Sequence, residues 1–244
     1  MGSEEVESEL VALRDAATVL RTTDRYDNRG NLSRTVDCIG DTCRLGGASF
    51  TAADLDSSEV TLEAVMTHNG LPVFQGARET DQADGGIART NVYGAWMANG
   101  AFWLQSNRLR DADGTTTAYE AYGATLGDAT GDRLTGSGTA TWSGIMLGFN
   151  LAATEGYHGD AAITVNFADA DVDVAFTNIH ELFTGAVQSD ITFSDVPMTP
   201  DGFASGARPN NRIAANFYGV DHAEVGGIFE HDDVLGAFGA KKDE

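Results

Sequence analysis

The chain has 244 residues, of which 42% are hydrophobic, so it is long enough to bury a core in one large domain or two small ones. Its 29 glycines against 4 prolines are typical of a turn-rich β protein rather than a helical one. With 37 acidic and 15 basic residues the formal net charge is −22, which argues against nucleic acid as a partner because its phosphates would be repelled.

An amphipathic helix is predicted at the N-terminus, over about residues 4–22. Its apolar residues recur every three or four positions, on one stripe of a helix: Val6, Leu10, Leu13, Ala17 and Leu20. We expect this helix to pack on the rest of the protein, with an interaction helix for another protein as the alternative. The start Met1-Gly2-Ser3 is typical of an expression start on a mature protein whose export signal has been removed. No apolar run approaches the roughly 18 residues that span a bilayer.

A disulfide is predicted between Cys38 and Cys43. The two cysteines lie in a segment, residues 28–48, that is rich in Gly, Asn, Asp and Ser, so a short ring can close there. On the chain-entropy account such a ring stabilises the fold by about 2 kcal/mol. Two cysteines without a histidine nearby are too few for a zinc site. The bond would imply an oxidising compartment.

The central segment contains short candidate strands and a cluster of aromatic residues. The strands are predicted over residues 60–66, 71–75, 92–97, 101–105 and 115–122, and the dipeptides Asn69-Gly70 and Asn99-Gly100 predict tight hairpin turns. The aromatic cluster comprises Tyr93, Trp96, Phe102, Trp103, Tyr119 and Tyr122. It has two interpretations: a ligand-binding face with a large contact area, or filling between this sheet and the rest of the protein.

From about residue 138 onward the alternation of apolar and polar residues is cleaner. Val172, Val174 and Phe176 alternate with polar residues, so one side of the strand is predicted to face a core and the other water. The predicted strands cover residues 138–148, 161–167, 171–179, 190–195, 211–218, 224–230 and 234–240. One strand from the preceding region would complete an eight-stranded antiparallel barrel, which side chains fill or which holds at most one small ligand.

The C-terminus carries a recognisable signature of three segments. These are Phe217-Tyr218-Gly219, then Glu224-Val225-Gly226-Gly227-Ile228-Phe229, then Gly236-Ala237-Phe238-Gly239-Ala240-Lys241. Upstream, Trp142-Ser143-Gly144 and Asn166-Phe167-Ala168-Asp169 follow the same family pattern. Together they resemble the transferrin-binding-protein-B-like β-barrel family of Gram-negative surface lipoproteins and secreted hemophores, over roughly residues 134–244.

The residue patterns and the resemblance together predict a mainly all-β fold with an N-terminal helix, a small β "handle" region and a C-terminal eight-stranded antiparallel barrel. The corresponding division is residues 1–48 for the helix and disulfide loop, 49–132 for the handle-like region and 133–244 for the barrel. In relatives of this family the handle carries much of the ligand contact, and residues 49–132 are in the right place for it.

No catalytic or metal-binding grouping stands out in the sequence. None of the histidines is spaced as a metal pair, and the acidic turns near Asp111 and Asp128 lack the spacing of a calcium loop. Ser143 lacks a nucleophile elbow, and no phosphate-binding glycine loop precedes a helix. His158, beside Tyr157 in a predicted loop with glycines on both sides, is the best candidate for an axial haem ligand.

We therefore expect a non-enzymatic binding protein at the cell surface, lipid-anchored in the outer membrane, or secreted. The resemblance implies capture of an iron source or related nutrient, protein or small molecule, for an outer-membrane transporter, with no cofactor of its own. Two alternatives are a haem-binding hemophore that uses His158 and an adhesin or host-factor binder. The expected ligand-binding residues are Tyr93, Trp96, Trp103, Tyr119, Tyr157 and His158.

Overall fold

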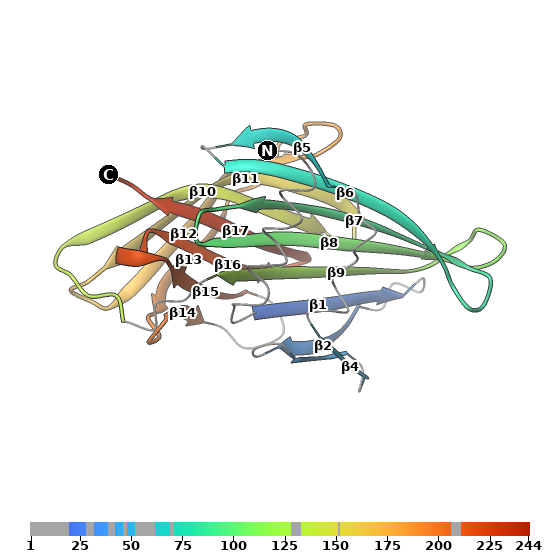
Figure 1. Ribbon diagram of the computed structural model, residues 1–244, viewed down its shortest axis with the longest axis horizontal. Coiled ribbons are helices and arrows are strands. Elements are labelled where there is room, and N and C mark those ends of the chain that lie inside the picture. The colour runs from blue at the N-terminus through green and yellow to red at the C-terminus, as the bar shows by residue number, and fades with distance from the viewer. Residues whose placement is uncertain are drawn as a thin grey trace.

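In the residues that it describes, the structure, a computed structural model, is made mainly of β-strands, and most of them belong to two large sheets (Figure 1). It describes residues 71–127, 133–150, 152–205 and 211–244, together with the backbone of five short strands between residues 20 and 68. Within the first range the side chains of a few strand residues, Trp96 and Tyr122 among them, are not described. In this described part no helix is long and apolar enough to cross a membrane.

One sheet has seven strands in the order β2-β1-β9-β8-β7-β6-β5, and we call it the handle sheet. Its strands are β1 (Leu20–Asp27), β2 (Leu32–Cys38), β5 (Leu62–His68), β6 (Leu71–Asp81), β7 (Ile87–Trp96), β8 (Gly100–Arg110) and β9 (Thr116–Gly127). A separate two-stranded sheet pairs β3 (Thr42–Leu45) with β4 (Ala48–Thr51). The predicted Asn99-Gly100 turn does join β7 to β8, with Trp96 opposite Ala101.

The other sheet has eight antiparallel strands in the order β13-β12-β11-β10-β17-β16-β15-β14. They are β10 (Thr139–Asn150), β11 (Glu155–Asn166), β12 (Asp171–Glu181), β13 (Ile191–Pro197), β14 (Gly202–Ser205), β15 (Arg212–Tyr218), β16 (Glu224–His231) and β17 (Val234–Lys242), with the short helix η1 (Val220–His222) between β15 and β16. A single bridge, between Met198 and Phe203, connects the two edge strands. The sheet is therefore a nearly closed barrel, which confirms the expected eight-stranded architecture.

The origin of the eighth barrel strand was predicted wrongly. It is β14, from within the barrel segment, and not a strand of the preceding region. β14 has only four residues, so it shows no alternation long enough to read from the sequence. It is held by pairing with β15 and by the buried ring of Phe203. A side chain at Gly202 would collide with the backbone oxygen of Ala215, so glycine permits this close pairing.

Two predictions concern the N-terminal third. The helix expected over residues 4–22 is wrong at its end, because residues 20–22 begin strand β1, which pairs with β9. Backbone pairing with a longer strand outweighs the helical spacing there. The rest of the expected helix lies outside the described residues. Cys38 ends β2 and Cys43 lies in β3, but their side chains also lie outside the described residues, so the disulfide stays a prediction.

The interior of the barrel is filled by side chains. The alternating residues predicted to face the core, such as Val172, Val174 and Phe176, are buried. The ring of Phe176 lies 4.6 Å from that of Phe229 and 5.2 Å from that of Phe238, measured between centroids. Trp142 is also buried and donates a hydrogen bond from Nε1 to the backbone oxygen of His222, at 2.8 Å. This packing fits the size of an eight-stranded barrel.

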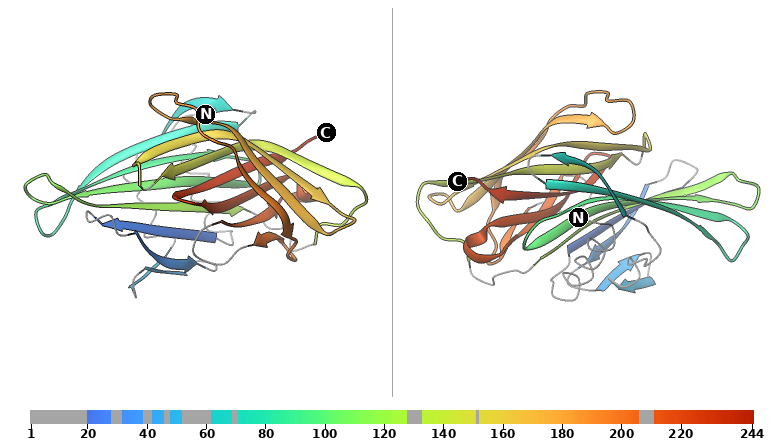
Figure 2. Two further views of the ribbon diagram at one scale, coloured as in Figure 1. Left: turned by 180° about the vertical axis from the view of Figure 1, so that it is seen from behind. Right: turned by 45° about the horizontal axis from the view of Figure 1, so that its top comes forward.

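The handle sheet packs against the outer surface of the barrel, over β10, β17 and β16 (Figure 1). Leu71, Phe102 and Leu104 of the handle sheet form one core with Ile145 and Leu235 of the barrel. The hairpins β6–β7 and β8–β9 extend well beyond the barrel at one end, as Figure 2 shows from two further directions. The handle sheet therefore has a packed half and an overhanging half.

Glycines of the C-terminal signature make this packing possible. A Cβ atom at Gly239 would lie 2.3 Å from Cδ1 of Phe102, and one at Gly226 would lie 2.3 Å from Oγ1 of Thr125. Any larger residue would force the two sheets apart. The signature residue Glu224 is buried, and its carboxylate accepts hydrogen bonds from the backbone nitrogens of Ala98 and Asn99, both at 2.7 Å. The β7–β8 turn is thereby attached to the barrel.

The barrel core predicts a large effect for Phe238→Ala. Phe238 is fully buried among other aromatic rings, so the substitution leaves a cavity and should lower the free energy of unfolding by about 3 to 5 kcal/mol. The matched control is Phe183→Ala, because Phe183 is 80% exposed and its removal should change the stability little. Urea denaturation of both variants tests this. Equal stabilities would mean that the strand register of β17 is wrong.

The contact between Tyr218 and the handle sheet predicts a loss of stability in alkali. Tyr218 is fully buried with its hydroxyl 3.1 Å from Oγ1 of Thr125, and burial raises the pKa of Tyr218 to about 12. The unfolded chain, with a tyrosine pKa near 10.0, releases this proton first, so stability falls as the pH rises from about 10 to about 12.

The loss attributable to Tyr218 should reach about 3 kcal/mol at the top of this range. Tyr218→Phe removes the titrating group, so its free energy of unfolding should fall less steeply across the same pH range, whatever the cost of the lost hydrogen bond. Urea denaturation at a series of pH values measures both slopes. Parallel slopes would show that Tyr218 ionises normally in the folded protein.

Candidate functional site

A cleft of about 290 Å³ lies where the overhanging half of the handle sheet meets the end of the barrel. We call it the handle–barrel cleft. Strands β7, β8 and β9 supply Arg89, Asn91, Tyr93, Leu104, Ser106, Asn107, Arg108 and Tyr119, and the barrel supplies Phe149, Thr154, Gly156, Leu182 and Phe183. Its volume is just below the range of about 300 to 1,000 Å³ for small-molecule sites.

The strand register brings the handle residues together in rows across the sheet. Arg89 of β7 lies opposite Arg108 of β8, which in turn lies opposite Tyr119 of β9. Tyr93 lies opposite Leu104 two rows further along. Directly opposed residues of antiparallel strands point to the same face. Since Leu104 packs on the barrel, both rows face the barrel and hence the cleft.

The polar groups of the handle side are positioned by local contacts. Arg108 donates a hydrogen bond from Nε to Oγ1 of Thr116, at 2.9 Å, which fixes the direction of the guanidinium. Burial raises the pKa of Tyr93 above its ordinary value of 10.0, and the positive charge of Arg89 partly opposes this shift. Tyr93 is therefore a neutral hydrogen-bonding group at physiological pH, beside a cation.

The barrel side of the cleft is apolar. Leu182 sits on Gly156, where a Cβ atom would come within 2.7 Å of Cδ1 of Leu182. The turn that carries Leu182 and Phe183 is shaped by Glu181, whose carboxylate accepts a hydrogen bond from the backbone nitrogen of Thr184. Hydrogen bonds from Thr184 lower the pKa of Glu181. Phe183 is 80% exposed, so a large aromatic ring stands free at the rim of the cleft.

Of the residues expected to bind ligand, Tyr93 and Tyr119 are brought together in this cleft. Trp103 is buried, and it lies on the other face of the handle sheet because its neighbours Phe102 and Leu104 face the barrel. Trp96 lies near the end of β7, and its side chain is outside the described residues. Within the expected aromatic cluster, Phe102 belongs to the core between the sheets. The cluster thus divides between core and cleft.

Tyr157 lies at the mouth of the barrel instead. Its ring belongs to the barrel core, and its hydroxyl donates a hydrogen bond to Oε2 of Glu155 at 3.0 Å. Burial, followed by the bond to Glu155, raises the pKa of Tyr157 to about 12. A second hollow, of about 230 Å³, opens beside it and is lined by Asn150, Tyr157, Ile179, Gln188, Ser189, Asp190, Ile191, His231, Asp232, Asp233 and Val234.

The expectation that His158 lies in a loop is wrong. His158 is the fourth residue of β11, opposite His180 of β12, and the two rings stack with centroids 6.0 Å apart. The flanking glycines that suggested a loop have a different role. A Cβ atom at Gly159 would come within 2.7 Å of the backbone oxygen of Thr177, so this glycine allows close packing beside a bulge. His158 was proposed as an axial haem ligand because a loop histidine can approach a porphyrin closely, and this reason no longer applies.

Arg89, Arg108, Asn91 and the whole barrel side of the cleft were not among the residues expected to bind ligand. A signal was present for the handle side, because Arg89, Asn91 and Tyr93 alternate on one strand. The sequence carries no comparable signal for the barrel side. Phe149 and Leu182 lie at or next to the ends of β10 and β12, and only the packing of the two sheets brings them to the cleft.

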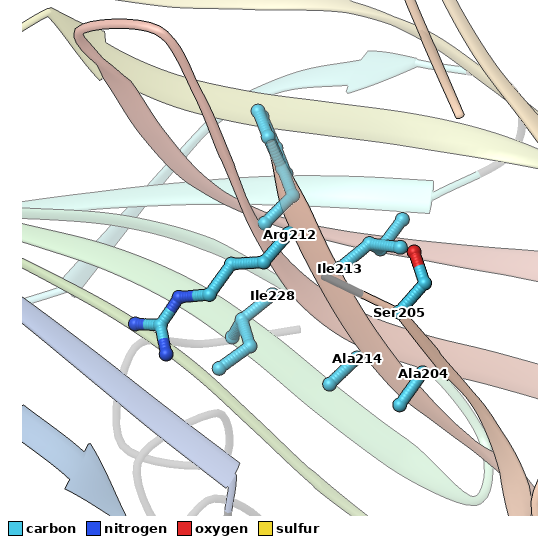
Figure 3. Close-up of a pocket in the computed structure, with 7 residues that line it drawn as sticks. Ala204, Ser205, Arg212, Ile213, Ala214 and Ile228 are labelled. Carbon is cyan, nitrogen blue, oxygen red and sulfur yellow. The ribbon is translucent and has the colours of Figure 1, made fainter. Parts of the chain in front are cut away.

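A third hollow, of about 220 Å³, lies beside the edge strands β14 and β15 (Figure 3). Ala204 and Ala214 point to the same side there, and the Arg212 side chain extends past Ile228. Arg212 forms an ion pair with the buried carboxylate of Glu230, so its charge is already compensated. In the part of the chain that the structure describes, no three His, Cys, Asp or Glu side chains are grouped to hold a metal ion.

A family model described as the C-lobe and N-lobe beta barrels of Tf-binding protein B matches residues 113–242. No match was found among curated protein sequences. The solved structure of intact Ap-TbpB, with N and C lobes, is 14% identical, with a TM-score of 0.40 and an alignment covering 91% of this chain and 46% of that one.

The vaccine antigen Transferrin Binding Protein B from Haemophilus parasuis Hp5, solved as a double mutant, is 12% identical. Its TM-score is 0.47, and the alignment covers 91% of this chain and 45% of that one. The present chain therefore spans less than half the length of either structure.

Proposed function

Because this chain belongs to the family of C-lobe and N-lobe β-barrels of Tf-binding protein B, we propose that it is a non-enzymatic binding protein whose ligand occupies the handle–barrel cleft. The observation that carries the proposal is the meeting of Tyr93 and Tyr119 with an apolar barrel rim in one concave site. Tyrosine offers a large rigid contact surface together with a hydroxyl, which suits recognition.

The barrel interior is a weaker candidate for the ligand site. Its centre is occupied by closely packed rings such as Phe176, Phe229 and Phe238. A ligand there would have to displace this core, which costs several kcal/mol per large side chain. The cleft needs no such rearrangement.

Membership of this family supports a proposal for the ligand class. We propose that the ligand is an iron source or a related nutrient, captured at the cell surface or after secretion and passed to an outer-membrane transporter. The relatives are transferrin-binding proteins by name, so transferrin itself is one ligand to test. Haem is another, although its proposed ligand His158 is not among the residues that line the cleft.

The decisive experiment identifies what the protein binds. The full chain, purified from its native host without denaturation, should carry a small molecule that native mass spectrometry detects. Incubation with haemin tests the hemophore alternative through a sharp Soret shift, and a transferrin pull-down tests a protein ligand. An absorbance shift that persists in His158→Ala would show that any haem site lies elsewhere.

Substitutions in the cleft should then weaken binding of the identified ligand. We expect Tyr93→Ala or Tyr119→Ala to reduce the binding free energy by about 1 to 3 kcal/mol, because each removes a rigid contact surface. The matched control is Tyr157→Phe at the barrel mouth, which should bind as the parent does. Calorimetric titration measures all three. Loss of affinity only in Tyr157→Phe would move the site to the barrel mouth.

A further inference from the structure

The handle–barrel cleft holds two arginines that face each other directly. Arg89 and Arg108 are cross-strand partners on β7 and β8, on the face that lines the cleft. Like charges in this position repel and lower the stability of a sheet. Two opposed arginines therefore lower the stability of the hairpin, unless an anion binds between their guanidinium groups.

Within the described residues the protein supplies no such anion. Neither Arg89 nor Arg108 forms an ion pair there, although the exposed Glu79 lies opposite Arg89 on β6. No carboxylate is among the residues that line the cleft. Glu155, next to the lining residues Thr154 and Gly156, instead accepts the hydrogen bond of Tyr157. In a chain of net charge −22, a cleft with two cations and no lining carboxylate is a selective environment for an anion.

The remaining residues that line the cleft indicate the shape and polarity of the uncharged part of the ligand. Tyr93 and Tyr119 stand on the handle side, and Phe149, Leu182 and Phe183 on the barrel side. Aromatic and leucine side chains on opposing walls favour a flat apolar group between them. Arginine guanidinium groups bind carboxylate or phenolate oxygens through two parallel hydrogen bonds.

We propose that the handle–barrel cleft binds a small anion with a flat apolar body, such as an aromatic carboxylate or phenolate. Arg89 and Arg108 bind the anionic group, and the tyrosine and phenylalanine rings enclose the body. This proposal rests on the proposed function, because it assigns the ligand to the same cleft. It further specifies the charge and the shape of that ligand. The volume of about 290 Å³ is enough for a small molecule of this kind.

The test uses three probes with the full chain at low ionic strength. 2-Naphthoate carries both the charge and the flat body, 2-naphthamide lacks the charge, and sulfate lacks the body. Calorimetric titration should show binding of naphthoate that weakens as salt is added, and weaker binding of the other two. Absence of naphthoate binding, or naphthamide binding as tightly as naphthoate, would overturn the role of the arginines. Sulfate binding as tightly as naphthoate would overturn the role of the rings.

Variants then locate the site. Arg89→Gln and Arg108→Gln should each raise the Kd of naphthoate by about ten- to a hundredfold, because each removes a charge-assisted hydrogen bond. The matched control is Arg133→Gln, since Arg133 is exposed and outside the cleft lining. Equal effects of all three variants would mean a general charge effect and no site. Circular dichroism and urea denaturation confirm that the variants fold.

The failure of this inference can be told apart from failure of the proposed function. A neutral co-purified ligand that loses affinity in Tyr119→Ala, with no naphthoate binding, would keep the cleft as the site and refute the anion. In the opposite case, naphthoate binding depends on Arg108, but the affinity for the co-purified ligand is unchanged in Tyr93→Ala and Tyr119→Ala. The cleft would then be an anion site, and the co-purified ligand would bind elsewhere.

Discussion

The close approach of two sheets is the constraint on which the rest of this structure depends. Residues of the C-terminal signature lie at the contact: Gly226 and Gly239 have no side chain to hold the sheets apart, and Glu224 binds the backbone of the β7–β8 turn. Tyr218 adds a buried hydroxyl against Thr125. The signature is therefore explained by packing between the handle sheet and the barrel as much as by the closure of the barrel itself.

The candidate site follows from this packing because the handle sheet is longer than the surface it covers. Near the β7–β8 turn the two sheets share a core, and towards the opposite hairpins they diverge (Figure 1). The space that opens between them is lined by the continuation of the same strand faces, with Tyr93 and Arg89 following Ala95 along β7. Because the barrel interior is filled by side chains, the proposed ligand site is the cleft at the boundary between the two sheets.

Local pattern predicted most of the barrel and little of the site. Strands such as β12 could be read from the sequence because each carries several alternations of a buried and an exposed residue. β14 was too short to show one, and the glycines beside His158 were read as loop signals although they serve close packing. Arg89 lies opposite Arg108 because of the register of β7 and β8. The Asn99-Gly100 turn predicts that register only when the last residue of β7 and the first residue of β8 are known.

The two hydrogen bonds that Glu224 accepts have a mechanical consequence. They fasten the handle sheet to the barrel at the β7–β8 turn, while the β6–β7 and β8–β9 hairpins at the other end project free of the barrel (Figure 2). The shared core and these hydrogen bonds hold one end of the handle sheet to the barrel, and the cleft lies between that end and the hairpin tips. A small rotation of the sheet about the held end would therefore displace the hairpin tips further than the residues that line the cleft.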